Sequence, residues 1–170
     1  MKVFPYSNLP FKRSILSKLI YTLIIYSLFT VGVLAQYVES DSILGLWNNE
    51  EHDASIEIYR CGEKYCGRIT WIKEPTYPTN DKNRKAGEPR MDDNNPDPKL
   101  RNRPIIGLTI MKDFMYAVKN SLEGGTVYDP KNGKTYKGKM TLISHNQMKL
   151  RGFVIFSLFG RTTLWTRIDS

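Results

Sequence analysis

The stretch from Gly125 to Arg167 constrains the fold more than any other part of the chain. It holds four short runs of β-forming residues, and turn signals separate them at Asp129–Gly133, Ser144–Asn146 and Ser157–Gly160. Closely spaced turn signals between alternating apolar and polar runs indicate an antiparallel meander. We expect the rest of the chain to close this meander into a small all-β barrel.

The N-terminal segment has the features of a secretory signal peptide. Three basic residues, Lys12, Arg13 and Lys18, precede a charge-free run that extends to Ala35. Small residues occupy the −3 and −1 positions before Gln36, as at a cleavage site. Residues 1–35 are therefore predicted to be a signal peptide, with an uncleaved inner-membrane anchor as the alternative. The protein is expected to be exported to the periplasm or the extracellular space.

Charge argues against a nucleic-acid partner. The chain has 25 Lys and Arg against 17 Asp and Glu, but four of the basic residues lie in the N-terminal segment, which has no acid. The excess from Gln36 onward is only about +4 and is scattered, whereas nucleic-acid binding needs a clustered basic face. We expect membrane contact only through the N-terminal segment, if it is not cleaved. Length predicts one domain, residues 36–170; the oligomeric state is left open.

The only two cysteines, Cys61 and Cys66, are expected to form a structural disulfide across a β-hairpin. A register set by this bridge places Ile58 opposite Ile69 and Ile56 opposite Trp71, all on one face. A redox-active pair is the alternative.

Residues 74–104 form a long loop whose first part, 74–99, is rich in Pro, Asn, Asp and Lys. A loop of this length is usually a lid or disordered. Asp93, Asn95 and Asp97 match the first ligand positions of a calcium loop, but Pro98 and Pro104 stand where Gly and Glu are needed. We favour a helix start instead, with Asp97 as the cap and Pro98 at the first helical position.

The register of the last hairpin has two alternatives. If Leu158-Phe159 is the turn, Trp165 lies opposite Gly152, and Arg161, Thr163 and Arg167 face inward. A register shifted by one residue turns Leu164 and Ile168 inward instead. In the preceding hairpin, Ser144–Asn146 is predicted to be a three-residue turn with Asn146 at positive φ.

Several motifs, in order, resemble the bacterial domain-of-unknown-function family 2147. Gly45-x-Trp47 alone resembles the opening of lipocalin-like barrels. The further motifs are Cys66-Gly67-Arg68-Ile69, Asn95-Pro96-Asp97-Pro98 with Leu100-Arg101, Arg103-Pro104-x-Ile106-Gly107-Leu108, Gly124-Gly125-x-Val127-Tyr128-Asp129-Pro130, Gly133-Lys134-x-Tyr136, Arg151-Gly152 and Trp165-x-Arg167.

The resemblance covers nearly everything after the signal segment. It implies an exported, lipocalin-like up-and-down barrel of about eight strands, and it implies no reaction or cofactor. In such barrels a first-strand Trp packs under an Arg of the last strand, so Arg167 is the expected partner of Trp47, with Arg161 second.

Catalysis is not predicted. The sequence lacks the Gly-x-Ser-x-Gly, His-Glu-x-x-His and phosphate-loop motifs, and it has two histidines. Carboxylates in the 92–97 loop are the one exception considered. No cofactor is expected.

Two non-catalytic functions compete. A small closed barrel can hold one small ligand, whereas a barrel filled by its own aromatic side chains and methionines suits a structural or interaction module of the cell envelope. For the first, we predict a small amphiphile with an anionic or polar head. Its predicted contacts are Arg161, Arg167, Tyr136, Trp71, Met140 and Leu150, because the strands beside the two arginines contain no acid to pair with them.

Overall fold

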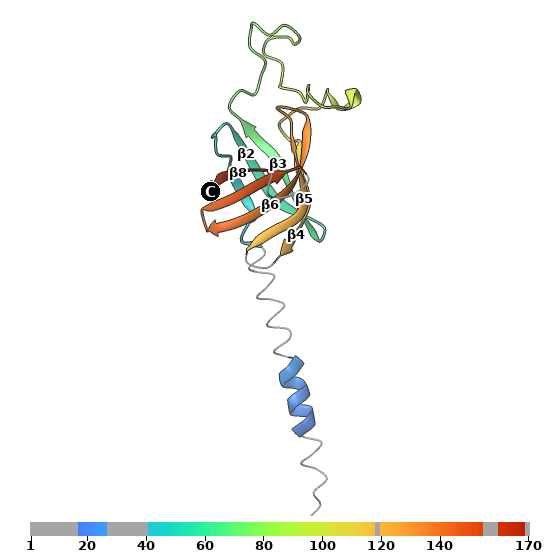
Figure 1. Ribbon diagram of the computed structural model, residues 1–170, viewed down its shortest axis with the longest axis vertical. Coiled ribbons are helices and arrows are strands. Elements are labelled where there is room, and N and C mark those ends of the chain that lie inside the picture. The colour runs from blue at the N-terminus through green and yellow to red at the C-terminus, as the bar shows by residue number, and fades with distance from the viewer. Residues whose placement is uncertain (1–16, 27–40, 118–119, 155–159, 169–170) are drawn as a thin grey trace, which may run out of the picture. The chain divides into compact units, whose positions relative to one another are not determined.

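The computed structural model describes residues 17–26, 41–117, 120–154 and 160–168 (Figure 1). Eight strands, each hydrogen-bonded to the next, form a closed antiparallel barrel in which β8 returns to pair with β1. The strands are β1 (Gly45–Asn48), β2 (Ala54–Cys61), β3 (Lys64–Ile72), β4 (Thr109–Ala117), β5 (Ser121–Asp129), β6 (Lys134–Ser144), β7 (Gln147–Phe153) and β8 (Gly160–Arg167). The predicted all-β up-and-down barrel is confirmed.

Residues 1–39 form a separate unit, of which the described part, 17–26, is helical. In the described parts of the chain, no helix has the length and apolar character needed to span a membrane. The predicted cleavage site before Gln36 lies outside the described residues. Signal-peptide cleavage therefore stays a prediction.

The barrel core consists of side chains that alternate inward along the strands. Trp47, Met111, Phe114, Leu122 and Met148 have no exposed surface. Trp165 is also buried, at 5% exposed, and its indole N–H donates to the Thr163 hydroxyl at 3.1 Å. These large side chains fill the interior from several strands at once.

The predicted disulfide is present: Cys61 and Cys66 are bonded, with their Cα atoms 5.9 Å apart. The hairpin register predicted from it is wrong by two residues, because the bridge joins diagonal positions. Tyr59, and not Cys61, lies opposite Cys66. An even shift leaves each side chain on its original face, and Ile56, Ile58 and Ile69 are all buried as expected.

Trp71 is the exception, and its predicted inward position is wrong. The β2–β3 pairing jumps from Ser55↔Trp71 to Ile56↔Ile69, which leaves Thr70 as an extra residue. Such a bulge reverses the alternation beyond it. Trp71 is therefore 47% exposed on the outer face.

The last hairpin follows neither predicted register. Gly152 pairs with Arg161, and Trp165 pairs with Met148, four residues from the expected partner. The shift is again even, so Trp165 still shares a face with the buried Met148 and Leu150. The turn proposed at Leu158-Phe159 lies outside the described residues.

The turn between β6 and β7 also differs from prediction. Residues 145–146 form a two-residue turn in which Asn146 lacks positive φ, and a register shift near Ile143 keeps Leu142 opposite Met148. The glycine pair Gly124-Gly125 lies inside β5.

Candidate functional site

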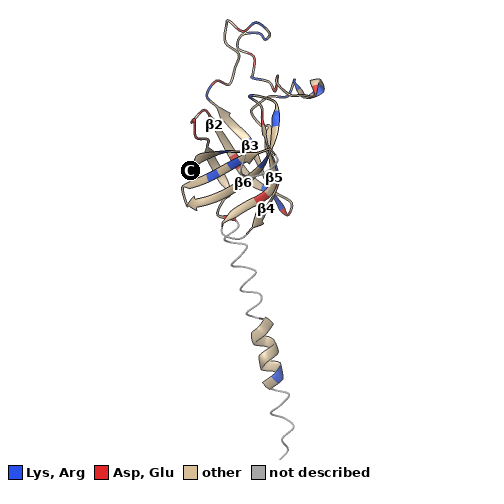
Figure 2. Cartoon of the chain, in the orientation of Figure 1, with Lys and Arg blue, Asp and Glu red and all other residues tan. Residues whose placement is uncertain are grey.

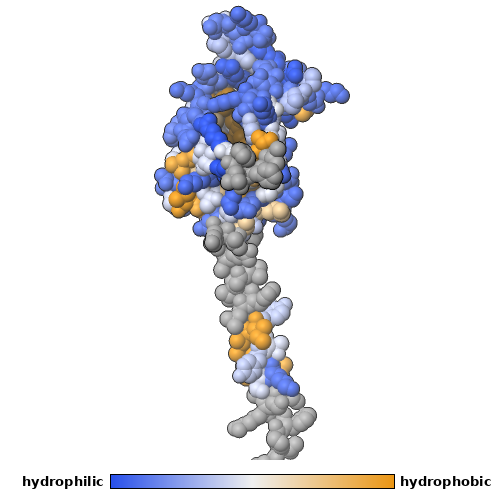
Figure 3. Space-filling view, in the orientation of Figure 1, coloured by the Kyte–Doolittle hydropathy of each residue, from blue (hydrophilic) through white to orange (hydrophobic). Residues whose placement is uncertain are grey.

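One end of the barrel is open toward the long loop. The β1–β2 connection (49–53), the long loop from residue 73, the β5–β6 turn (130–133) and the start of β8 all lie at this end. Figure 3 shows a hollow below the long loop, with hydrophobic residues at its floor. We call this end the mouth.

Three inward glycines lie side by side below the mouth on β5, β6 and β7. Gly125 pairs with Gly138, and Gly138 pairs with Gly152. The Phe114 ring covers the first two, because a Cβ at Gly125 or Gly138 would lie 2.3 or 2.5 Å from its atoms. Among the described residues, a Cβ at Gly152 would meet only Tyr136, at an ordinary contact distance of 3.7 Å. The third glycine is therefore less tightly packed than the other two.

The structure does not bring the predicted ligand contacts together. Tyr136 adjoins Gly152, and Leu150 and Thr163 face each other one step below on β7 and β8. Met140, at 1% exposed, is enclosed in the core. Val154, just beyond the end of β7, is 65% exposed. Leu150, at 7% exposed, also belongs to the core, and Trp71 lies on the outer face, so of the predicted contacts named here only Tyr136 adjoins Gly152.

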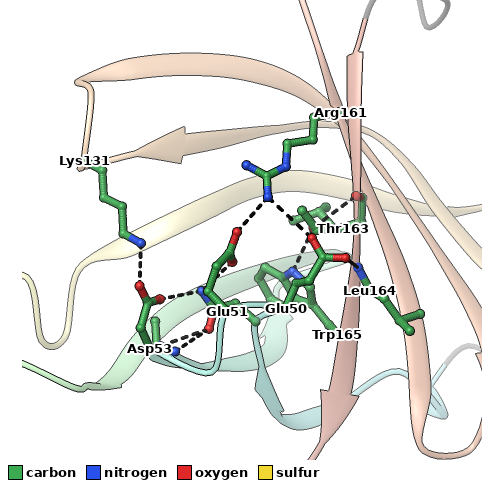
Figure 4. Close-up of polar contacts among 11 residues, drawn as sticks. Glu50, Glu51, Asp53, Lys131, Arg161, Thr163, Leu164 and Trp165 are labelled. Atoms are coloured by element: carbon green, nitrogen blue, oxygen red, sulfur yellow. Dashed lines mark hydrogen bonds and ion pairs between the residues drawn. The ribbon is translucent and has the colours of Figure 1, made fainter.

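A polar rim of five charged residues surrounds the mouth (Figure 4). Arg161 donates to Glu51 at 2.8 Å and lies 3.4 Å from Glu50, which also accepts the Leu164 N–H. On the other side Lys131 pairs with Asp53 at 2.7 Å. Burial raises the pKa of Asp53, but hydrogen bonds from Lys131 and Asn49 outweigh it and leave the pKa below its usual value.

The expectation that Arg161 and Arg167 depend on a ligand anion, because the neighbouring strands have no acid, is wrong. Arg161 is 72% exposed and paired with two carboxylates of the β1–β2 connection, a segment far from it in sequence. Arg167 lies at the closed end, with its guanidinium 4.2 Å from the centre of the Trp47 ring. It donates to the carbonyls of Leu44 and His145 at 2.6 and 2.7 Å. The predicted Trp47–Arg167 contact is confirmed, and neither arginine requires a ligand anion.

The long loop is held beside the mouth by a buried carboxylate. Asp92 is fully buried and accepts hydrogen bonds from Tyr128 (2.5 Å), Asn95 (2.7 Å) and Arg103 (2.9 Å). Burial, together with the bond to Asp92, raises the pKa of Tyr128 to about 12. Both carboxylate oxygens of Asp92 accept hydrogen bonds, one from Tyr128 on β5 and the other from Asn95 and Arg103 in the loop. The cluster therefore anchors the loop to β5.

The residues weighed as metal ligands have separate structural roles. Asp97 caps the 3₁₀ helix Pro98–Leu100 by accepting the Lys99 N–H at 3.0 Å, as predicted. Asp93 accepts hydrogen bonds from Tyr77 and Arg84, and Asn95 belongs to the Asp92 cluster. Within the described ranges, no three His, Cys, Asp or Glu side chains are grouped as metal ligands would be.

A family model matches residues 45–167, the whole span of the barrel strands. Its description is an uncharacterized protein conserved in bacteria, DUF2147. The chain belongs to this family. Several motifs of the family resemblance meet around the Asp92 cluster, which includes Asn95, Arg103 and Tyr128. No curated protein matches the chain significantly.

A solved structure supports the fold. Protein HP1028 from the human pathogen Helicobacter pylori, described as belonging to the lipocalin family, matches with a TM-score of 0.63 at 22% identity. The match covers 75% of this chain and 84% of that one. At this identity the likeness establishes a lipocalin-like barrel, and no ligand is carried over from it.

Sequence reasoning missed two parts of the mouth. Glu50 and Glu51 were not expected to face Arg161, because the contact depends on barrel closure between the first and last strands. The Asp92 cluster was also missed, although Arg103 and Tyr128 were both quoted among the family motifs. The available signal was that Asp92 comes shortly before the motif Asn95-Pro96-Asp97-Pro98.

Proposed function

We propose that this protein binds a small amphiphile at the mouth of the barrel, with its apolar part over Gly152 and its polar end among the rim residues. The observation that supports this is the looser packing of the third glycine in the row, where a Cβ would meet only ordinary contact with Tyr136 among the described residues. A glycine that faces the interior beside loosely packed side chains lets a ligand approach the backbone. Tyr136, Leu150 and Thr163 supply a mixed apolar and hydroxyl lining.

The charges of the rim favour a particular polar end. Three acids and two bases are present, and each base is already paired. Figure 2 likewise shows acidic and basic residues interspersed over the strands and the loop. A ligand with a lone anionic head would meet an excess of carboxylates, so a neutral or zwitterionic head is the better complement.

Binding without catalysis is the role we propose. The carboxylates that sequence analysis weighed for chemistry, in the 92–97 loop, are held by hydrogen bonds within the loop and to β5. We also propose export, which the disulfide supports, since such bonds persist in oxidising compartments.

A filled barrel acting as an interaction module is the second candidate. The tight packing of Trp47, Phe114 and Met148 favours the interaction module. These side chains fill the closed half of the barrel and have no exposed surface. The two functions differ in one measurable respect. Only the ligand-binding function requires the mouth to take up a small molecule.

Calorimetric titration with three ten-carbon probes tests the ligand-binding function. Decanol, decanoate and decylphosphocholine share a tail and differ in head-group charge. We expect saturable binding below their micellar range, with decanoate no tighter than decylphosphocholine. Gly152→Leu places a side chain in the proposed space and should weaken binding about tenfold or more, the effect of about 1.4 kcal/mol.

Lys149→Leu is the matched control, because Lys149 is exposed on the same strand and faces outward. It adds the same side chain without filling the mouth and should leave the dissociation constant unchanged. Thermal unfolding establishes that both variants fold. If no probe binds, or Gly152→Leu binds as wild type does, the mouth is not a ligand site and the interaction function is favoured.

A further inference from the structure

A groove of about 790 Å³ lies on the outer face of the barrel, beside the disulfide. Its walls include Cys61 and Cys66, the end of the long loop and the middle of β4. Cys66 points outward because its neighbours Tyr65 and Gly67 face the core. The groove is therefore separate from the mouth, and its volume lies within the range of small-molecule sites, about 300–1,000 Å³.

The backbone beside the groove is irregular. The β3–β4 ladder shifts register twice, between Tyr65 and Gly67 and again between Gly67 and Arg68. Asp113 has φ of 62°, a left-handed conformation that non-glycine residues seldom adopt. Bulges redirect side chains and are common next to binding sites. Left-handed backbone conformations of non-glycine residues also cluster at binding sites. Here they place Lys112 and Asp113 along the groove wall.

The charges in the groove leave one cation unmatched. Asp113 pairs with Lys64 at 2.7 Å, and Arg103 pairs with the buried Asp92 at 2.9 Å. Lys112 forms no ion pair with any residue in the described part of the chain. A ligand that carries one negative charge would complement it.

Part of the remaining wall is apolar, beside Gly107 and Thr109. The disulfide, Pro104 and Leu108 line the groove together with Ile106, which is 45% exposed. Exposed apolar side chains gathered in a concave surface beside a few polar groups are typical of ligand sites.

From these features we infer that the groove is a second binding site, for a small carboxylate with an aromatic or branched apolar body. The carboxylate contacts Lys112, and the body lies against the disulfide and Ile106. This site is independent of the mouth, since the two share no lining residue.

Amide NMR titration of the intact chain with phenylacetate and phenylacetamide tests the second site. The probes have the same ring, and only the first is charged. We expect saturable shifts at Cys66, Gly107 and Lys112 with phenylacetate. The neutral amide should bind at least about fivefold more weakly, as the loss of a charge-assisted contact implies.

Lys112→Gln should reduce phenylacetate affinity to that of phenylacetamide, while Lys149→Gln, an exposed lysine on β7, should not change it. Ile106→Asp, at a position already exposed to solvent, should abolish binding with the fold intact. Equal affinity for the two probes, wild-type affinity in Lys112→Gln, or shifts that gather at Gly152 and Thr163 would each overturn the second site.

Discussion

Arg167 links three separate parts of the chain at the closed end of the barrel. Its guanidinium lies over Trp47 and donates to the carbonyls of Ser42, Leu44 and His145. A planar guanidinium can stack and donate at the same time, which an ammonium group does less well. The residue therefore holds the first strand, the last strand and the β6–β7 turn together.

Replacing Arg167 by Ala should lower the free energy of unfolding by about 1–3 kcal/mol, from the lost ring contact and lost hydrogen bonds. Arg167→Lys should recover less than half of this. Chemical denaturation measures both, with Lys149→Ala on the outer face as the control. A denaturation midpoint in Arg167→Ala equal to that of wild type would show that the contact contributes nothing.

Two glycines of the inward row, Gly138 and Gly152, should differ in how much stability is lost when each is replaced by Ala. Gly138→Ala puts a methyl group 2.5 Å from Phe114 and 2.9 Å from Val127, so the core must shift. Overpacking of this kind costs about 1–3 kcal/mol. Gly152→Ala meets only ordinary contact with Tyr136 and should stay within about 0.5 kcal/mol of wild type. Equal destabilisation of the two variants would mean that the space over Gly152 is already filled.

Sequence reasoning at this scale succeeded where a residue's partner follows from the family resemblance and failed where it follows from barrel closure. The Trp47–Arg167 contact was predicted in this way. The pairing of Arg161 with Glu50 and Glu51 was not, because these residues are more than a hundred positions apart and belong to no shared motif. Residue type alone indicated a need for charge pairing but did not identify the partner.

Among the elements, the long loop is an ordered part of the barrel unit near its anchor. The Asp92 cluster fixes it to β5, and Asn94 donates to the carbonyls of Pro130 and Lys131 at 3.2 and 3.0 Å. Predicting the loop's existence required only its composition. Predicting its anchor would have required knowing that Tyr128 lies at the same end of the barrel.

Alkaline pH should loosen this anchor. The pKa of Tyr128 is raised to about 12, above its ordinary value of 10.0. A raised pKa in the folded state means that the stabilisation is complete below pH 10 and is lost as the pH rises from about 10 to 12. We expect the free energy of unfolding to fall by up to about 2 kcal/mol across this window.

Tyr128→Phe tests the assignment. The variant should be less stable at neutral pH by about 1–3 kcal/mol, because one oxygen of the buried Asp92 loses its donor. It should also lose most of the alkaline decline, while the raised pKa of Tyr77 leaves a remainder. Unfolding measured from pH 8 to pH 12 checks both. A decline as steep as in wild type would assign the effect to another group.

For the whole molecule, the alternation of inward and outward side chains was predicted more reliably than the pairing register of the strands. Both hairpins whose register was predicted wrongly were displaced by an even number of residues, so the inward set was largely retained. The inward position predicted for Trp71 failed because this residue lies beyond a bulge. A bulge inserts one residue without a composition signal, and the period-2 pattern gives no warning of it.

At this scale the two halves of the barrel differ in packing. The closed half is filled by Trp47, Phe114 and the buried methionines, and Arg167 seals its end. The other half has the loosely packed Gly152 position below a charged rim and an anchored loop. The choice between a ligand-binding barrel and a filled one, which the sequence left open, stays a proposal.

The central claim is that an amphiphile lies over Gly152, and a spin-labelled ten-carbon amphiphile added to isotope-labelled protein tests it most directly. Paramagnetic broadening of amide signals falls steeply with distance, so it maps where the label sits. We predict the strongest broadening at Gly152, Thr163 and Tyr136, and its loss in Gly152→Leu. Broadening that is absent, uniform over the surface, or strongest at Cys66 and Lys112 would contradict the claim.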